Sequence, residues 1–182
     1  MDYSPAVMSP DYARLTWDFH VSPDSCDNPA HYEEYLRLCA INDQENGMGV
    51  THLLLDKDEN GKTIAIAGYV TLRATSLVGT DNDGTKTVNP ALEIAELAVD
   101  KDYERKGVGT ELVRLAISVA DKLQRKFLGI KNIVLCADPK AVEFYKKKKF
   151  GMIEDWYEAL RDGWNNHCEA MYMAMSDLDN LE

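Results

Sequence analysis

The sequence predicts a single mixed α/β domain over residues 1–182, with a mixed central sheet and helices on both of its faces. Its length suits one domain with its own core. Residues 51–56 and 63–72 are apolar runs joined by a turn that contains Asn60-Gly61, a pairing typical of β-hairpins. Residues 91–99 read as a further strand, after which the chain changes to helical periodicity. Strands that alternate with helices in this way are typical of mixed architectures.

The first half of the chain begins with an irregular segment and continues into a helix. Four prolines interrupt residues 1–30, where only residues 12–20 favour a short strand. Tyr32, Tyr35, Leu36 and Cys39 recur at helical spacing and predict a helix over residues 31–45, ended by Asn46-Gly47. After the hairpin, residues 79–89 are expected to form a polar loop.

The second half adds a long helix and three further strands. Its apolar stripe consists of Val108, Leu112, Leu115, Ala116, Val119 and Leu123. Residues 133–137 are expected to form a buried strand and residues 139–147 a short helix. Residues 150–157 and 170–175 are the expected closing strands.

Charge and composition disfavour several classes of protein. The net charge of −11 disfavours a nucleic-acid partner, because it repels phosphate backbones at long range. No segment approaches the roughly 18 uncharged apolar residues of a membrane helix, and the N-terminus lacks a secretory pattern. A cytoplasmic protein without a membrane partner is therefore expected, and its oligomeric state is left open.

The cysteines and histidines predict no metal site. Cys26, Cys39, Cys136 and Cys168 form no closely spaced pair and are interpreted as reduced, structural thiols. The histidines also lack metal-ligand spacing. The segment from Asp56 to Gly61 resembles the start of a calcium loop, but Ala67 stands where the loop needs a bidentate glutamate.

A glycine-bearing turn before the long helix is the most informative segment. The strand over residues 91–99 leads through Arg105-Lys106-Gly107-Val108-Gly109-Thr110 into the helix. The first turn of a helix has unpaired amides and a partial positive charge, and glycine lets a phosphate approach the backbone. Arg105 and Lys106 would add charge-assisted contacts, although both could equally be ordinary exposed residues. An anion site is therefore predicted here.

Two motifs in this chain resemble those of the GNAT superfamily of N-acetyltransferases. The glycine turn is similar to the family's acetyl-CoA-binding signature, Gln/Arg-x-x-Gly-x-Gly/Ala. The segment Asp138-Pro139-Lys140-Ala141-Val142-Glu143-Phe144-Tyr145 is similar to the later Asn-x-x-Ala-x-x-Phe-Tyr segment. The resemblance covers residues 50–155 well and the first thirty residues hardly at all. It implies acetyl-CoA as co-substrate.

The resemblance also implies a set of cofactor-binding residues. The strand backbone at Leu97, Ala98 and Val99 would pair with the pantetheine arm, and residues 104–110 would hold the pyrophosphate. One departure is Glu104, which stands where the family has Gln or Arg and would place an anion against a phosphate. In the second motif, Asp138 replaces Asn, and Lys149 replaces the glycine that usually precedes the next aromatic residue.

The implied catalytic residues are Tyr145 and Glu93. Tyr145 matches the tyrosine that protonates the departing thiolate, although its ring could simply belong to the core. Glu93 resembles in position the glutamate base of histone-acetylating members. Glu96, three residues further along and on the opposite face of the strand, or a water molecule, are the alternatives.

The resulting prediction is an N-acetyltransferase in which a primary amine attacks acetyl-CoA directly. The acidic chain favours a small cationic amine or a basic peptide as acceptor. Two alternatives stay open. The segment from Gly68 to Leu72, with Pro90 and residues 95–100, also resembles the branch of toxins that acetylate aminoacyl-tRNA. The imperfect motifs would also permit a non-catalytic CoA-binding or interaction module.

Overall fold

The computed structural model describes residues 3–80, 82–153, 157–159 and 168–180. It contains two compact units. Unit 1 comprises residues 1–73 and 95–116, and unit 2 comprises residues 74–94 and 117–182. Strands β3 (Thr63–Thr80) and β4 (Lys86–Val99) and helix α3 (Val108–Lys126) each begin in one unit and end in the other.

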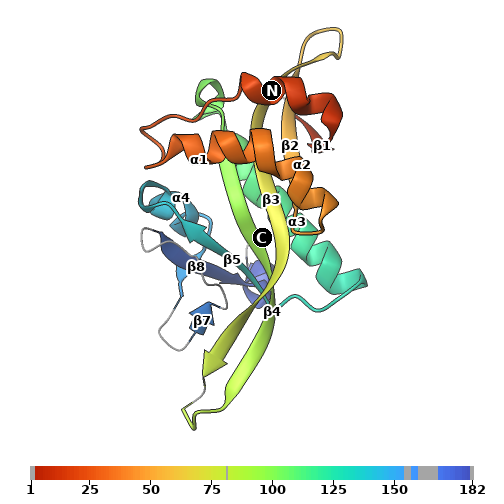
Figure 1. The fold of residues 1–182 in the computed structure, drawn as a ribbon. Coiled ribbons are helices and arrows are strands. Elements are labelled where there is room, and N and C mark those ends of the chain that lie inside the picture. Colours follow the sequence, from red (N-terminus) through yellow and green to blue (C-terminus); the bar gives the residue numbers. More distant parts are fainter. Residues whose placement is uncertain (1–2, 81, 154–156, 160–167, 181–182) are drawn as a thin grey trace. The chain divides into compact units, whose positions relative to one another are not determined.

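Unit 1 contains the antiparallel strand order β1-β2-β3 together with the N-terminal helices (Figure 1). Its further elements are β1 (Ser4–Val7), β2 (Val50–Lys57), the 3₁₀ helices η1 (Pro10–Trp17) and η3 (Lys101–Tyr103), α1 (Pro29–Glu34), the π-helical turn η2 (Tyr35–Cys39) and α2 (Ala40–Glu45). The predicted helix over residues 31–45 is confirmed, with a π turn in its middle. The predicted hairpin is confirmed as β2 and β3, and β3 extends further than expected.

Helices cover both faces of the sheet within unit 1. Leu36 and Ala40 pack in one buried cluster with Tyr69 of β3. The preceding residue, Gly68, faces Val108 and Leu112 of α3. Because neighbouring strand residues point to opposite faces, the N-terminal helices and α3 lie on opposite sides of β3. The predicted arrangement of helices is therefore confirmed in this unit.

Two expectations for the N-terminal segment are wrong. Residues 10–17 form η1 instead of a strand, because Ser9 has the extended backbone of an N-cap and Pro10 occupies the first helical position. Residues 4–7 are not irregular, since they form strand β1 in antiparallel register with residues 52–55 of β2. Pro5 is compatible with this position, because β1 is an edge strand.

Unit 2 contains the strand order β4-β5-β8-β6. The β4 and β5 strands are parallel and the other pairs are antiparallel, so the sheet is mixed as predicted. The predicted loop over residues 79–89 is wrong in extent, because β3 continues to Thr80 and β4 begins at Lys86. The further elements are β5 (Asn132–Ala137), η4 (Pro139–Ala141), α4 (Val142–Lys146), β6 (Gly151–Met152), β7 (Tyr157–Ala159), β8 (Glu169–Ala174) and η5 (Met175–Asn180). Of the predicted strand over residues 150–157, residues 154–156 lie outside the described part.

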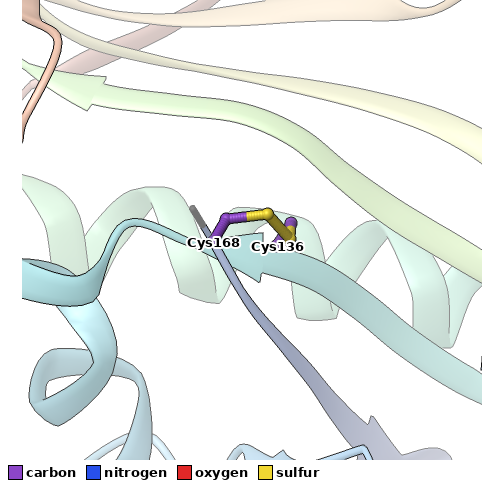
Figure 2. The surroundings of a disulfide bond; sticks show 2 residues. All are labelled: Cys136 and Cys168. Atoms are coloured by element: carbon purple, nitrogen blue, oxygen red, sulfur yellow. A yellow bond between two sulfur atoms is a disulfide. The ribbon is translucent and has the colours of Figure 1, made fainter. Parts of the chain in front are cut away.

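A disulfide joins Cys136 of β5 to Cys168, the residue before β8 (Figure 2). The interpretation of these two cysteines as reduced is therefore wrong. The antiparallel register aligns Cys136 with Ala170, which brings Cys168 within 5.5 Å of Cys136 between their Cα atoms. This separation suits a disulfide. Sequence spacing could not show it, because 32 residues separate the two cysteines. Cys26 and Cys39 take no part in this disulfide.

Candidate functional site

The predicted site residues fall in both units. Residues 97–99 and 104–110 belong to unit 1, whereas Glu93, Asp138 and Tyr145 belong to unit 2. In unit 1, the end of β4, η3 and the start of α3 follow one another directly, so the predicted pantetheine and pyrophosphate segments are consecutive.

Asp100 fixes the beginning of the turn that leads to α3. Its buried carboxylate accepts hydrogen bonds from the backbone amides of Asp102 and His20, both at 2.9 Å. The backbone amide of Lys101 also donates to the carbonyl of His20. At the other end of η3, the Tyr103 hydroxyl donates to Asp56 at 2.7 Å. The N-terminal segment and β2 therefore hold this turn in place.

The carboxylate of Glu104 has a hydrogen-bond partner in the N-terminal segment. Its Oε1 atom accepts a hydrogen bond of 2.7 Å from the Ser25 hydroxyl. This contact gives the carboxylate a partner on the N-terminal segment. The departure from the family signature at Glu104 is thus accommodated by Ser25, which sequence reasoning missed because 79 residues separate the two.

The glycine turn has the backbone geometry that an anion site requires. Gly107 has a φ of +87°, and a Cβ atom built on it would have no heavy atom within 4 Å. The Glu111 amide donates to the Gly107 carbonyl at 3.1 Å, so the amides of residues 108–110 lie in the first turn of α3. Arg105 and Lys106 are exposed, and Arg105 has a φ of 58°. Open space, helix amides and two cations therefore meet at one turn.

Gly68 permits the close approach of α3 to the sheet beneath this turn. A Cβ atom at position 68 would lie 2.8 Å from Val108 Cγ1, 2.9 Å from the Ala98 carbonyl oxygen and 3.0 Å from Leu112 Cδ1. These distances are shorter than side chains tolerate. The glycine therefore lets the first turns of α3 pack closely on β3, and its role follows only from the packing of segments far apart in the sequence.

Glu96, beside the predicted pantetheine strand, is paired with His31 of α1. The His31 Nε2 atom lies 3.1 Å from Glu96 Oε2. The hydrogen bond to Glu96 raises the pKa of His31 above its usual value of 6.5, with the charges of Glu96 and Glu34 adding to this effect and burial opposing it. Sequence reasoning considered Glu96 but assigned no role to His31, because nothing in the spacing joins α1 to β4.

In unit 2, Asp138 and Tyr145 have structural partners. Asp138 caps η4, with Oδ1 accepting from the Lys140 amide at 2.9 Å. The Tyr145 side chain is 6% exposed, and its ring makes edge contacts with Phe144 and Phe150. Lys149 has a φ of 70°. Its left-handed backbone explains why glycine is usual at this position in the second motif.

Glu93 lies on β4 opposite Val134 of β5 and is 2% exposed. Its side chain is therefore buried. A buried carboxylate needs polar partners. Glu93 and Glu96 therefore have different surroundings, since Glu96 pairs with a half-exposed histidine.

Neither a membrane span nor a metal cluster occurs in the described residues. No helix there is both long enough and apolar enough to cross a membrane. Across the same residues, no group of three His, Cys, Asp or Glu side chains could hold a metal ion.

Comparisons with known proteins agree with the fold. Solved structures with a similar fold include a tyrosine-to-phenylalanine mutant of the AtaT toxin, at 18% identity and a TM-score of 0.76, covering 99% of this chain and 93% of that chain. A tyrosine-to-phenylalanine mutant of KacT has 15% identity and a TM-score of 0.76, with 100% of both chains covered. AtaT complexed with acetyl-methionyl-tRNAfMet has 17% identity and a TM-score of 0.75, with 99% of both chains covered.

Sequence comparison identifies the family. No curated protein sequence matches the chain significantly. The model of the acetyltransferase (GNAT) family, however, matches residues 11–152, which is most of the chain and includes both motifs. The chain therefore belongs to the GNAT family of acetyltransferases, enzymes whose acetyl donor is acetyl-CoA.

Proposed function

We propose that this enzyme transfers the acetyl group of acetyl-CoA to a primary amine, and that it holds the cofactor with residues 97–99 and 105–110. The observation that carries the proposal is the turn before α3. There, Gly107 leaves open space at the first amides of a 19-residue helix, and the Ser25 hydroxyl engages the carboxylate of Glu104. The proposed contacts are backbone pairing at Leu97, Ala98 and Val99, and pyrophosphate binding at Arg105, Lys106, Gly107, Val108, Gly109 and Thr110. Asp138, in the second motif, is a further proposed cofactor contact.

In the proposed reaction, the amine nitrogen forms a bond to the thioester carbon, and the carbon–sulfur bond breaks. A backbone amide near Leu97 polarises the carbonyl, and the Tyr145 hydroxyl donates a proton to the departing thiolate. Glu93, Glu96 or a water molecule takes the proton that the amine loses. The direct transfer depends mainly on holding the two reactants in the correct orientation.

We propose a small cationic amine or a basic peptide as the acceptor. The chain has 31 acidic and 20 basic residues, and this excess of negative charge raises the rate at which cations encounter the protein. Acetyl-CoA and such amines meet in the cytoplasm, which is the proposed location of the enzyme.

Aminoacyl-tRNA is the second candidate acceptor. Its support is the likeness of the whole chain to the structure of AtaT complexed with acetyl-methionyl-tRNAfMet. The net charge of −11 argues against it, because a protein that binds tRNA gains much of its affinity from contacts with phosphates. The two acceptors therefore predict salt responses of different size: high ionic strength should inhibit the tRNA reaction strongly and the reaction of a small amine only weakly.

The test has two parts. Acetyl-CoA at 100 times its Kd should stabilise the native protein by about 2.7 kcal/mol, visible as a raised melting temperature. Thiol release is then followed with methionyl-tRNA, a lysine-containing peptide and a small diamine. Stabilisation without turnover of any acceptor would favour the non-catalytic module. The absence of binding would refute the cofactor site.

Gly109→Val adds a specific test of the turn. A branched side chain in the first turn of α3 should lower the affinity for CoA more than it lowers stability. Gly129→Val serves as the control, because a Cβ atom at position 129 meets nothing within 4 Å. Gly107 is less suitable for this comparison, since any side chain there strains a backbone with positive φ. Equal CoA affinities of the Gly109→Val variant and the wild type would contradict the proposed pyrophosphate contact.

A further inference from the structure

The His31–Glu96 pair combines an imidazole that can accept a proton with a carboxylate that can orient it. His31 Nε2 lies 3.2 Å and 3.1 Å from the two carboxylate oxygens of Glu96. An ionised carboxylate can only accept hydrogen bonds, so in the neutral imidazole Nε2 carries the hydrogen. The proton-accepting nitrogen is then Nδ1. The His31 side chain is half exposed, whereas that of Glu96 is 13% exposed.

Contacts in unit 1 fix the backbone beside His31. The Asn28 side chain caps α1 by accepting a hydrogen bond from the His31 amide. The Tyr32 carbonyl accepts a 2.8 Å bond from the hydroxyl of Tyr69, which is fully buried on β3. The π turn η2 begins three residues after Tyr32. After the start of this turn, Leu36 and Ala40 are buried in the core cluster. π turns recur at functional sites.

The location of the pair connects it to the proposed reaction. Glu96 directly precedes Leu97, where the proposed pantetheine strand begins. His31 comes from α1. The neighbouring Tyr32 packs against the buried cluster that contains Tyr69 and Ala98. The half-exposed ring of His31 is accessible to an acceptor, in contrast to Glu93, which is 2% exposed.

We propose that His31 is the general base of the acetyl transfer, and that Glu96 is a positioning residue that holds its tautomer and ring orientation. The proposal rests on the proposed function and replaces its three alternatives for the proton acceptor. The amine nitrogen forms its bond to the thioester carbon and loses one proton to His31 Nδ1. The carbon–sulfur bond breaks, and its electron pair leaves with the thiolate, which is protonated to CoA.

The charges around His31 set the direction of its pH dependence. Glu96 on β4 and Glu34 on α1 are the carboxylates that raise its pKa, and the ring of Tyr32 packs edge-on against the imidazole. A base acts in its neutral form, so activity should be lost as the pH falls through the pKa of His31. Removal of the Glu96 charge lowers that pKa. The acid limb of the pH profile should therefore move to lower pH.

The test compares pH profiles of kcat/KM for the wild type, His31→Gln, Glu96→Gln and Glu93→Gln with an acceptor that the wild type acetylates. Glutamine keeps an N–H group that can donate to Glu96 but cannot accept the proton. We expect His31→Gln to lower kcat about 10²-fold or more, with the acid limb abolished and CoA affinity retained. His52→Gln is the matched control, since His52 lies on β2 outside the proposed machinery. Addition of imidazole to His31→Gly should restore part of the activity.

The outcomes separate the two proposals. Wild-type turnover with an unchanged profile in His31→Gln would overturn the base assignment and leave the acetyltransferase proposal intact. Loss of the acid limb in Glu93→Gln alone would assign the base to Glu93. Absence of wild-type turnover with every acceptor would overturn both proposals. An NMR titration of His31 provides a readout without substrate. A pKa above 6.5 that falls in Glu96→Gln supports the pair, and an unchanged pKa contradicts it.

Discussion

The replacement of Gly68 by alanine tests how closely α3 approaches the sheet. The new Cβ atom would lie 2.8 Å from Val108 Cγ1 and 3.0 Å from Leu112 Cδ1, both ends of side chains that could shift. It would also lie 2.9 Å from the Ala98 carbonyl oxygen, which is backbone and can move only with β4. Inserting a methyl group into such a packed position costs about 1–3 kcal/mol. At about 2–4 °C per kcal/mol for a protein of this size, the melting temperature should fall by several degrees.

Gly129→Ala is the matched control for Gly68→Ala. Its new methyl group meets no heavy atom within 4 Å. Both variants gain the same stabilisation from a less flexible unfolded chain, about 0.4–1 kcal/mol, so this gain cancels in the comparison. Thermal unfolding by circular dichroism measures the difference, and calorimetry with CoA measures binding. We expect Gly68→Ala to bind CoA more weakly as well, because its first α3 turn is displaced. Equal melting temperatures would refute the reasoning.

Three further predictions concern single side chains. Tyr145→Phe should keep the melting temperature and the CoA affinity, because the ring contacts remain. It should lower kcat about 10²-fold if the hydroxyl is the general acid. A large fall in melting temperature would instead assign the hydroxyl to the core. Ser25→Ala frees Glu104 to face the turn and should weaken CoA binding several-fold in calorimetry, whereas Ser25→Ala combined with Glu104→Gln should restore it. Lys149→Gly relieves a backbone with a φ of 70° and should stabilise the protein by up to about 1 kcal/mol in urea unfolding; a loss of stability would contradict this.

Local patterns predicted most of the helices and strands. The apolar stripe of α3 and the Asn60-Gly61 hairpin depend on neighbours in the sequence, and both are present in the structure. The glycine turn was also predictable, because the conformation of Gly107 and the start of α3 are local properties. The edge strand β1 was not, since it depends on pairing with residues 52–55, which are far away in the sequence.

The residues that complete the candidate site could not be predicted for the same reason. Ser25 is an ordinary loop residue until Glu104 approaches it, and His31 gains its partner only when α1 packs near β4. The Cys136–Cys168 disulfide likewise depends on the register of β5 and β8. Family resemblance predicted the cofactor segment but gave no information about its partners in the first thirty residues.

The contacts between the N-terminal segment and the turn before α3 have a consequence for folding. His20 and Ser25 form hydrogen bonds with Asp100 and Glu104 across 80 and 79 residues of chain. Contacts with such large sequence separation close long loops and form slowly. The hydrogen bonds that hold the turn can therefore form only after more than half of the polypeptide has been synthesised. A nascent chain that has folded only its hairpin would lack these contacts, so we expect its affinity for CoA to rise only when the N-terminal segment reaches the turn.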